Sequence, residues 1–128
     1  MREVKFRAKS MNKKDNRWHY GLIRSIAEDG TGFIQEQHKN CIHINTDTIG
    51  QYTGLLDFNG VEVYEGDIVK LIEDRNRDGI FEPFIAGQVK FRNGSFYITD
   101  GAISRFRWED YVVEVVGNIY ESPELLDD

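Results

Sequence analysis

Cysteine is almost absent from this sequence: Cys41 is the only one, so no disulfide can form within the chain. Proline is scarce as well, with 2 residues, and no apolar run extends beyond a few positions. A membrane-spanning helix needs about 20 consecutive apolar residues, and a secretory signal needs an apolar core behind a basic start. We therefore expect neither a membrane span nor a signal peptide, and we predict a cytoplasmic protein.

Acidic and basic residues are unevenly distributed along the chain. The net charge of the 128 residues is −6, yet residues 1–24 contain eight Lys or Arg against two Asp or Glu. This first segment carries +6, which leaves −12 for the remainder. An acidic whole argues against nonspecific nucleic-acid binding over the entire surface, because phosphate contacts need clustered Lys and Arg. Residues 1–24 are the segment in which Lys and Arg are clustered.

The opening segment alternates charged and apolar side chains, which is the two-residue period of a strand with one buried and one solvated face. The pattern places Val4, Phe6 and Ala8 inside and the basic side chains on the solvated face, namely Lys5, Arg7 and Lys9. Residues 17–26 repeat the alternation and predict a partner strand. Two short strands are predicted next, at residues 33–37 and 41–44.

The predicted partner strand carries an aromatic face. Trp18, Tyr20 and Leu22 stand at alternate positions of a basic stretch. Alternating aromatics often form core, but the rings of Trp18, His19 and Tyr20 can also stack on nucleic-acid bases while neighbouring Lys and Arg hold phosphates. The sequence leaves both interpretations open.

Asn93-Gly94 is the clearest hairpin signal in the second half, because both residues accept the positive φ of a two-residue type I′ turn. Such a turn pairs Phe91 with Phe96 and Val89 with Ile98 on one face. We expect those four side chains to be core.

Residues 57–60, Asp-Phe-Asn-Gly, predict another turn. A two-residue loop of Asn59 and Gly60 would set Asp57 opposite Glu62, an unfavourable like-charge pair. We therefore predict a type I turn that begins at Asp57 and holds Gly60 in the left-handed conformation.

Short strands separated by Gly, Asn and Asp turns predict a mainly β protein. We predict an N-terminal β-hairpin subdomain over residues 1–50 and a small SH3-like barrel over residues 51–128. The two can also form one continuous domain. Ser122 as an N-cap and Pro123 in the first turn predict a short C-terminal helix.

Three segments resemble the YopX family of bacteriophage and prophage proteins. They are the opening residues 1–8, the closing residues 114–126 and, most specifically, residues 51–69, which contain Thr-Gly-Leu-x-Asp-x-Asn-Gly followed by Tyr-Glu-Gly-Asp. The resemblance implies a nearly all-β fold and a phage or prophage origin, hence the cytoplasm of a bacterial host. It implies no established biochemical activity.

Two segments carry metal-ligand residues. Asp74, Asn76 and Asp78 have the spacing of a calcium loop, but the twelfth position is Ile85, which lacks the bidentate carboxylate that such a loop requires. His38, Cys41 and His43 bring together three soft ligands without a fourth, and a fourth ligand from His19 would depend on folding. We expect an ordinary polar loop and an exposed polar strand face, and no metal or cofactor.

Catalytic patterns are missing from the sequence. Glu62, Glu65 and Asp67 cluster near a Gly-Asp turn, where acidic groups usually cap the backbone or are solvated. We find no Ser-His-Asp set, no Cys-His nucleophile pattern and no phosphate-binding Gly-rich loop. We therefore expect no enzyme activity.

The function that we predict is that of a noncatalytic phage accessory protein, acting by self-assembly or by binding a host or phage macromolecule, for example a protein. In a homo-oligomer, the basic N-terminal segment would contact acidic surface of a neighbour through Lys5, Arg7 and Lys9. The alternative is a nucleic-acid-binding module, and its contact residues would be Lys13, Lys14, Arg17, Trp18 and Arg24.

Overall fold

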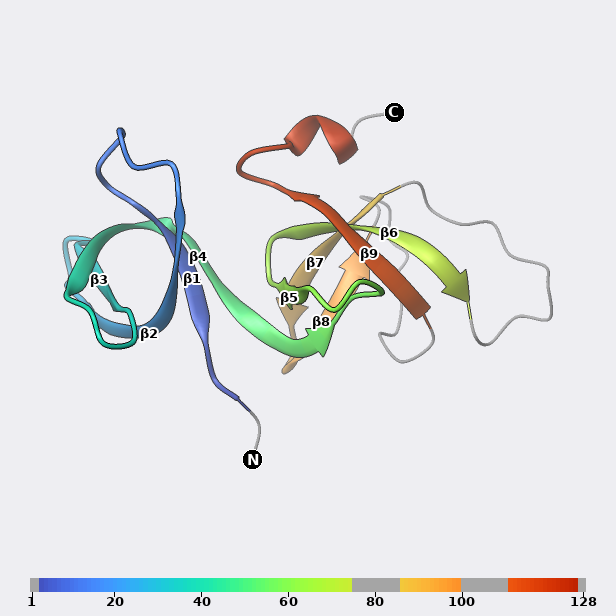
Figure 1. The fold of residues 1–128 in the computed structure, drawn as a ribbon, viewed down its shortest axis with the longest axis horizontal. Helices are drawn as coiled ribbons and strands as arrows, with labels where there is room; N and C mark the ends of the chain where they lie inside the picture. The colour runs from blue at the N-terminus through green and yellow to red at the C-terminus, as the bar shows by residue number, and fades with distance from the viewer. Residues whose placement is uncertain (1–2, 75–85, 100–110, 127–128) are drawn as a thin grey trace. The chain divides into compact units, whose positions relative to one another are not determined.

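The computed structural model describes residues 3–74, 86–99 and 111–126 of the chain. Nine strands and one short 3-10 helix lie in these ranges, so the prediction of a mainly β protein is confirmed (Figure 1). The proposed calcium ligands Asn76 and Asp78 lie outside the described residues, as does the side chain of Asp74.

The chain divides into two compact units, Met1–Gly54 and Leu55–Asp128. The predicted boundary lay four residues earlier in the sequence, between residues 50 and 51. One strand, β4 (Cys41–Leu56), runs from the first unit into the second. The division into a β-hairpin subdomain and an SH3-like barrel stays a prediction.

The first unit is built on a ring of strand pairings. Strand β1 pairs with β2, β2 with β3, β3 with β4, and β4 returns to pair with β1, all antiparallel. The three strands that precede β4 are β1 (Phe6–Ser10), β2 (Trp18–Ile26) and β3 (Gly32–Gln35). Ala8, Ile34 and Ile44 form the buried centre. Because the ring is small, its interior holds few side chains.

Strand β4 is far longer than the predicted strand over residues 41–44. Its pairing with β1 shifts register, since Arg7 lies opposite Gly50 whereas Lys9 lies opposite Asn45. Within this bulge the Lys9 backbone N–H donates to Thr48 Oγ1 at 2.8 Å, and the Thr48 hydroxyl donates to the Asn45 carbonyl at 2.6 Å. A side-chain hydroxyl therefore replaces the missing ladder partner, which allows the polar residues 45–51 to continue the strand.

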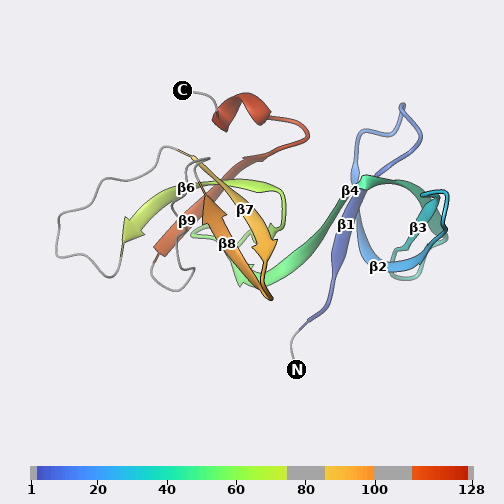
Figure 2. The ribbon, with the colours of Figure 1, turned by 180° about the vertical axis from the view of Figure 1, so that it is seen from behind.

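The second unit contains a four-stranded antiparallel sheet in the order β8-β7-β6-β9 (Figure 2). Its strands are β6 (Asp67–Asp74), β7 (Gly87–Arg92), β8 (Ser95–Thr99) and β9 (Tyr111–Asn118). A three-residue strand, β5 (Glu62–Tyr64), follows β4 in the order of the other sheet. The core of this unit is aliphatic and consists of Val63, Val69, Leu71, Val89, Ile98 and Val113.

The predicted hairpin between β7 and β8 is confirmed, with Phe91 opposite Phe96 and Val89 opposite Ile98. Asn93 and Gly94 both have positive φ, 54° and 81°, as a type I′ turn requires. Val89 and Ile98 are fully buried, but the prediction for Phe91 is wrong because 49% of it is exposed. Phe91 lies edge-on to Phe96, with 5.0 Å between ring centroids, one residue pair away from the turn of the hairpin.

The turn at Asp57 also has the predicted form. Gly60 has a φ of 81°, and its N–H donates to the Asp57 carbonyl at 3.0 Å. The Asp57 carboxylate accepts the backbone N–H groups of Asn59 and Val61, both at 2.8 Å, and of Val115 at 2.9 Å. The aspartate therefore holds the turn and links it to β9.

One turn of 3-10 helix, Pro123–Leu126, is the last described element, which confirms the predicted short C-terminal helix. The Leu125 N–H donates to the Ser122 carbonyl at 3.0 Å. Within the described ranges, no helix has the length and apolar character that crossing a membrane requires.

Substitutions in the β7–β8 hairpin test this assignment of core and surface. Ile98→Ala should lower the free energy of unfolding by about 2–5 kcal/mol, because it opens a cavity at a fully buried position. Phe91→Ala should cost about 1.5 kcal/mol or less, since it removes mainly an exposed edge-to-face pair. Urea unfolding of both variants gives the comparison, and a larger loss for Phe91→Ala than for Ile98→Ala would contradict the observed burial.

Candidate functional site

Strand β2 turns its aromatic face outward. Its inward residue His19 is 3% exposed, whereas Tyr20 is 43% and Leu22 is 56% exposed. Trp18 is half-buried and lies on the same outward face, two residues before Tyr20. The sequence left open whether these side chains form core or an exposed face. In the structure, they are not part of the core of the first unit.

Strand β1 places basic side chains beside this aromatic face. In the antiparallel register Arg7 lies opposite Tyr20, and Lys9 lies opposite Trp18. The Arg7 guanidinium carbon is 4.4 Å from the Trp18 ring centroid, and Lys9 Nζ is 5.2 Å from it. Both cations lie over the electron-rich ring face of the indole, an attractive arrangement. We call these four outward residues, together with Leu22, the β1–β2 face.

The prediction that Arg7 lies on a solvated face is wrong, because Arg7 is 6% exposed. Its alternation with Phe6 and Ala8 is correct, but the outward side of β1 is covered where the Trp18 ring packs on it. Arginine accepts such a position because its planar guanidinium is weakly hydrated and stacks on aromatic rings. Arg7 is therefore unsuited to the direct oligomer contact predicted for it.

The two lysines of the predicted oligomer contact have partners within the first unit. Lys9 Nζ donates to the Asn16 carbonyl at 2.7 Å. Lys5 Nζ lies 3.5 Å from Glu3 Oε1 and 5.5 Å from the Tyr52 ring centroid. Both remain partly accessible at the edge of the β1–β2 face.

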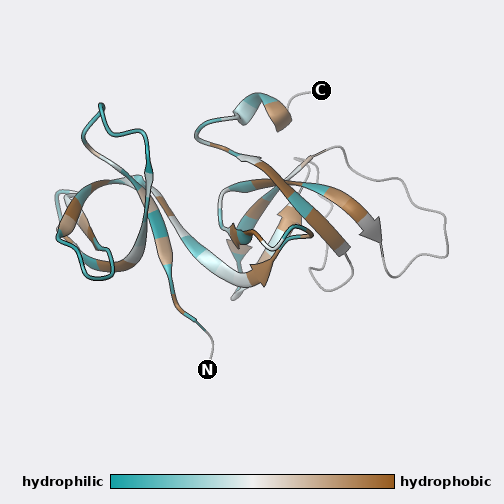
Figure 3. Cartoon of the chain, in the orientation of Figure 1, coloured by the Kyte–Doolittle hydropathy of each residue, from teal (hydrophilic) through white to brown (hydrophobic). Residues whose placement is uncertain are grey.

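The loop between β1 and β2, residues 11–17, is hydrophilic and carries three exposed basic side chains (Figure 3). These are Lys13, Lys14 and Arg17, all of them among the predicted nucleic-acid contacts. The loop folds through short side-chain bonds to its own backbone: Asn12 Oδ1 accepts the Lys14 N–H at 3.0 Å, and Asp15 Oδ1 accepts the Arg17 N–H at 3.1 Å. Its cations thus adjoin the end of the β1–β2 face at Trp18.

Arg24 does not join the other predicted contacts. It lies six residues after Trp18 on β2, about 20 Å along an extended strand. Its Nη1 donates to the Cys41 sulfur at 3.1 Å. Arg24 therefore belongs to the part of the outer surface near β3 and β4.

The sequence offered His19 as a fourth metal ligand and as a base-stacking ring, but did not predict its burial inside the ring of strands. Its Nε2 lies 2.7 Å from Asp15 Oδ2 in the loop, and its Nδ1 lies 3.0 Å from Glu36 Oε1 after β3. The two carboxylates bond opposite nitrogens of the ring, so they do not converge on a common point as metal ligands would. They satisfy a polar side chain inside the ring of strands.

The proposed soft-ligand cluster is distributed along the turn after β3 and the outer side of β4. Cys41 donates to Gln35 Oε1 at 3.1 Å, and the His43 ring stacks on Phe33 with 5.2 Å between centroids. His38 occupies a turn position with a φ of 59°. Among residues 3–74, 86–99 and 111–126, no three His, Cys, Asp or Glu side chains are arranged to hold a metal ion.

The acidic cluster near the Gly-Asp turn has structural contacts. Asp67 is buried, and its Oδ2 accepts the Tyr64 N–H at 2.7 Å across the turn. Glu62 Oε1 accepts the Tyr64 hydroxyl at 3.0 Å. These carboxylates act on the backbone and on a neighbouring tyrosine of the same turn.

A groove of about 360 Å³ lies at the other end of the β1–β2 face. Its lining includes Val4, Lys5, Gly21 and Leu22. A Cβ added at Gly21 would stand 2.0 Å from the Gln35 carbonyl oxygen, so glycine is required where β2 passes β3. The groove gives the face an apolar hollow beside a lysine.

Two comparisons relate the chain to known proteins. The family model described as YopX protein matches residues 5–127, nearly the whole chain, so the resemblance seen in the sequence is confirmed. The crystal structure of protein EF1440 from Enterococcus faecalis is similar, with a TM-score of 0.55 and 25% identity over 99% of this chain and 100% of that chain. No curated protein matches the chain.

The pH dependence of stability tests the contacts of Asp15. Hydrogen bonds from the backbone and side chain of Arg17, and then from His19, lower the pKa of Asp15 from 3.8 to about 2. A carboxyl group whose pKa is lowered by folding stabilises the fold above its unfolded pKa, and this contribution is lost as pH falls through its folded pKa. We therefore expect the stability advantage of the wild type over Asp15→Asn to shrink between about pH 4 and pH 2, measured by urea unfolding. An advantage that stays constant from pH 6 to pH 2 would contradict these contacts.

Proposed function

The chain belongs to the YopX protein family, and we propose that it is a noncatalytic accessory protein of a bacteriophage or prophage that binds a macromolecule. The observation that carries the proposal is the outward orientation of the β1–β2 face. Tyr20 and Leu22 expose aromatic and aliphatic surface beside the cations of β1 and of the following loop. Soluble monomers usually bury such side chains, and grouped exposure of this kind is typical of binding surfaces.

Single-stranded nucleic acid is the macromolecule whose chemistry best fits this face. Aromatic side chains on a strand stack on successive bases, and flanking Lys and Arg neutralise the phosphates between them. The β1–β2 face has a half-exposed tyrosine, and the loop at its end adds Lys13, Lys14 and Arg17. Residues 1–24 carry +6, so the phosphate contacts would come from this segment although the whole chain is acidic.

Tyr20, rather than Trp18, is the residue expected to stack on a base. The indole of Trp18 is already in contact with Arg7 and Lys9. These cations orient the tryptophan, and Trp18 in turn shields the Arg7 guanidinium. Of the aromatic residues that the sequence offered for stacking, we therefore keep Tyr20, and we leave Arg24 out of the proposed phosphate contacts because it lies far along β2.

Self-assembly is the second candidate function, favoured by the opposite charges of the two segments of the chain. The basic segment of one copy and the acidic remainder of another would attract each other, which orients association more than it strengthens it. Lys13 and Lys14 are better placed for this contact than Arg7, because both lysines are exposed and Arg7 is buried. An SH3-like barrel in the second unit would offer a further strand surface for such a contact.

Binding of a fluorescent single-stranded oligonucleotide tests the first candidate. We expect Tyr20→Ala to weaken binding by about fivefold or more, since loss of one stacked base costs about 1–3 kcal/mol. Phe91→Ala is the matched control, because it removes a similarly exposed aromatic ring from the second unit. Affinity should fall with salt, and equal affinities for the two variants, or no binding by the wild type at low salt, would contradict nucleic-acid binding through this face.

Light scattering after size-exclusion chromatography tests the second candidate. If the chain assembles through its basic segment, the double substitution Lys13→Glu and Lys14→Glu should shift it toward monomer at tens of micromolar. A wild type that is monomeric at that concentration would contradict self-assembly. An oligomer that the double variant leaves intact would place the contact elsewhere in the chain.

A further inference from the structure

His19 connects two loops to the inside of the first unit. It stands on β2 opposite Ala8 of β1, among the least exposed residues of the ring. Its two nitrogens contact Asp15 at 2.7 Å and Glu36 at 3.0 Å. An ionised carboxylate only accepts hydrogen bonds, so each ring nitrogen faces an acceptor from a different loop. The imidazole therefore braces residues 11–17 and the turn after β3 against one strand.

Asp15 is the centre of the loop that His19 holds. Its Oδ2 faces His19, whereas its Oδ1 accepts both the backbone N–H of Arg17 at 3.1 Å and the side-chain Nε at 3.2 Å. The Asp15 backbone N–H donates to the Asn12 carbonyl at 2.9 Å. One carboxylate thus sets the turn of the loop, the direction of the Arg17 side chain and the attachment of both to β2.

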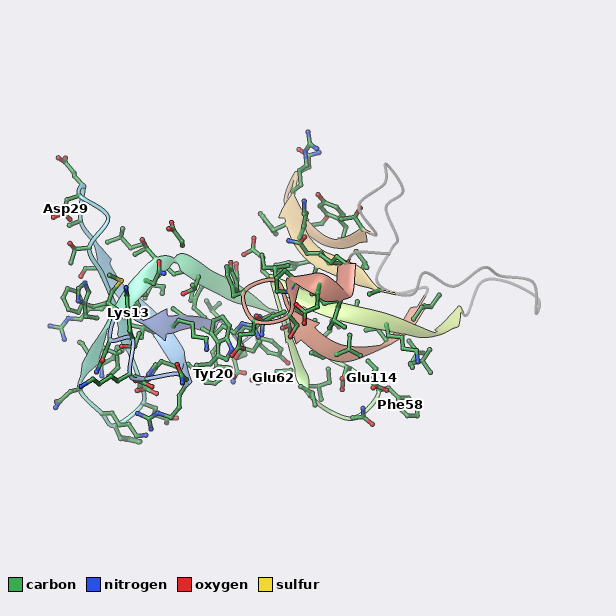
Figure 4. The ribbon with its side chains drawn as sticks, turned by 90° about the horizontal axis from the view of Figure 1, so that it is seen from above. Lys13, Tyr20, Asp29, Phe58, Glu62 and Glu114 are labelled. Carbon is green, nitrogen blue, oxygen red and sulfur yellow. The ribbon has the colours of Figure 1, made fainter. Side chains whose placement is uncertain are left out.

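The side chains that this loop displays are cationic. Lys13 and Lys14 are exposed, and 81% of the Arg17 side chain is exposed. Figure 4 labels Lys13 on this loop. On the other side, Lys9 of β1 bonds to the Asn16 carbonyl. The loop is therefore fastened at both of its strands while its basic side chains extend into solvent.

We propose that Asp15 and His19 are positioning residues that hold residues 11–17 as a preformed phosphate-binding arm beside Tyr20. The inference rests on the proposed binding of single-stranded nucleic acid. A loop that is already ordered loses less conformational entropy when it binds, so its cations contribute more affinity than the same residues on a mobile segment. The brace touches no phosphate itself and acts through Lys13, Lys14 and Arg17.

Asp15→Ala distinguishes positioning from simple electrostatics. Removing a negative charge beside three cations would by itself strengthen binding to an oligonucleotide. Loss of the brace should instead weaken binding, by about fivefold to tenfold at 50 mM salt, and should reduce the salt slope by about 2, because single strands contribute about 0.7 per phosphate contact. Binding of a single-stranded oligonucleotide measured from 50 to 300 mM salt gives both quantities.

Asp29→Ala is the matched control. Asp29 also caps a loop of the first unit, where its Oδ1 accepts the Thr31 N–H at 3.0 Å, and its removal changes the net charge by the same amount. We expect this control to keep the wild-type affinity and salt slope or to bind slightly more tightly. His19→Gln removes the brace on β2, because the single amide nitrogen cannot occupy both ring-nitrogen positions that contact Asp15 and Glu36. It should reproduce the effect of Asp15→Ala.

Hydrogen exchange separates this inference from the function on which it rests. Backbone amides of residues 12–17 should exchange about tenfold faster in Asp15→Ala and His19→Gln than in the wild type, with Asp29→Ala unchanged. If the wild type binds no oligonucleotide, the phosphate arm is refuted together with the proposed function, whereas faster exchange would still establish the brace. Unchanged exchange, or tighter binding by Asp15→Ala, would overturn the positioning role.

Discussion

The pairing of β1 with both β2 and β4 is the constraint on which the first unit depends. It closes four short strands into a ring, and the space inside is filled by Ala8, Ile34 and Ile44. His19 and Ala8 face this centre, so the alternation along β2 places Trp18 and Tyr20 on the outer face. The surface that we propose as a binding site therefore follows from which face of β2 the closed ring encloses.

The same closure places a polar side chain inside. When Trp18 and Tyr20 face outward, the alternation of β2 turns His19 inward. A buried imidazole without partners would be costly, and Asp15 and Glu36 supply those partners from loops on either side of β2. The buried His19 is thus stabilised by carboxylates that lie outside the strands of the ring. Its contact with Asp15 also fixes the conformation of the basic loop.

The outer surface of the first unit has two kinds of cationic side chain: those that pack on the Trp18 ring and those that are exposed to solvent. Arg7 and Lys9 contact the Trp18 ring, which keeps this part of the face rigid. Lys13 and Lys14 extend from a braced loop, and Tyr20 follows on β2, two residues beyond Trp18. Such an arrangement has the features of a preorganised binding surface, because its anchor residues are fixed before a ligand arrives. The second unit has its own aliphatic core and contributes its turns and hairpin independently.

Local chemistry allowed the sequence to determine the strands, the β7–β8 hairpin, the Asp57 turn and the family. Each depends on residues adjacent in the chain, such as Asn93-Gly94, whose backbone preferences act without tertiary context. The sidedness of β2, the burial of Arg7 and the length of β4 were decided only by the tertiary structure. The sidedness of β2 depends on which of its faces the closed ring encloses. The burial of Arg7 depends on stacking against Trp18, and the length of β4 depends on the Thr48 hydroxyl, which replaces a ladder partner. Those interactions join residues that only the closed ring brings together, so alternation along one strand cannot reveal them.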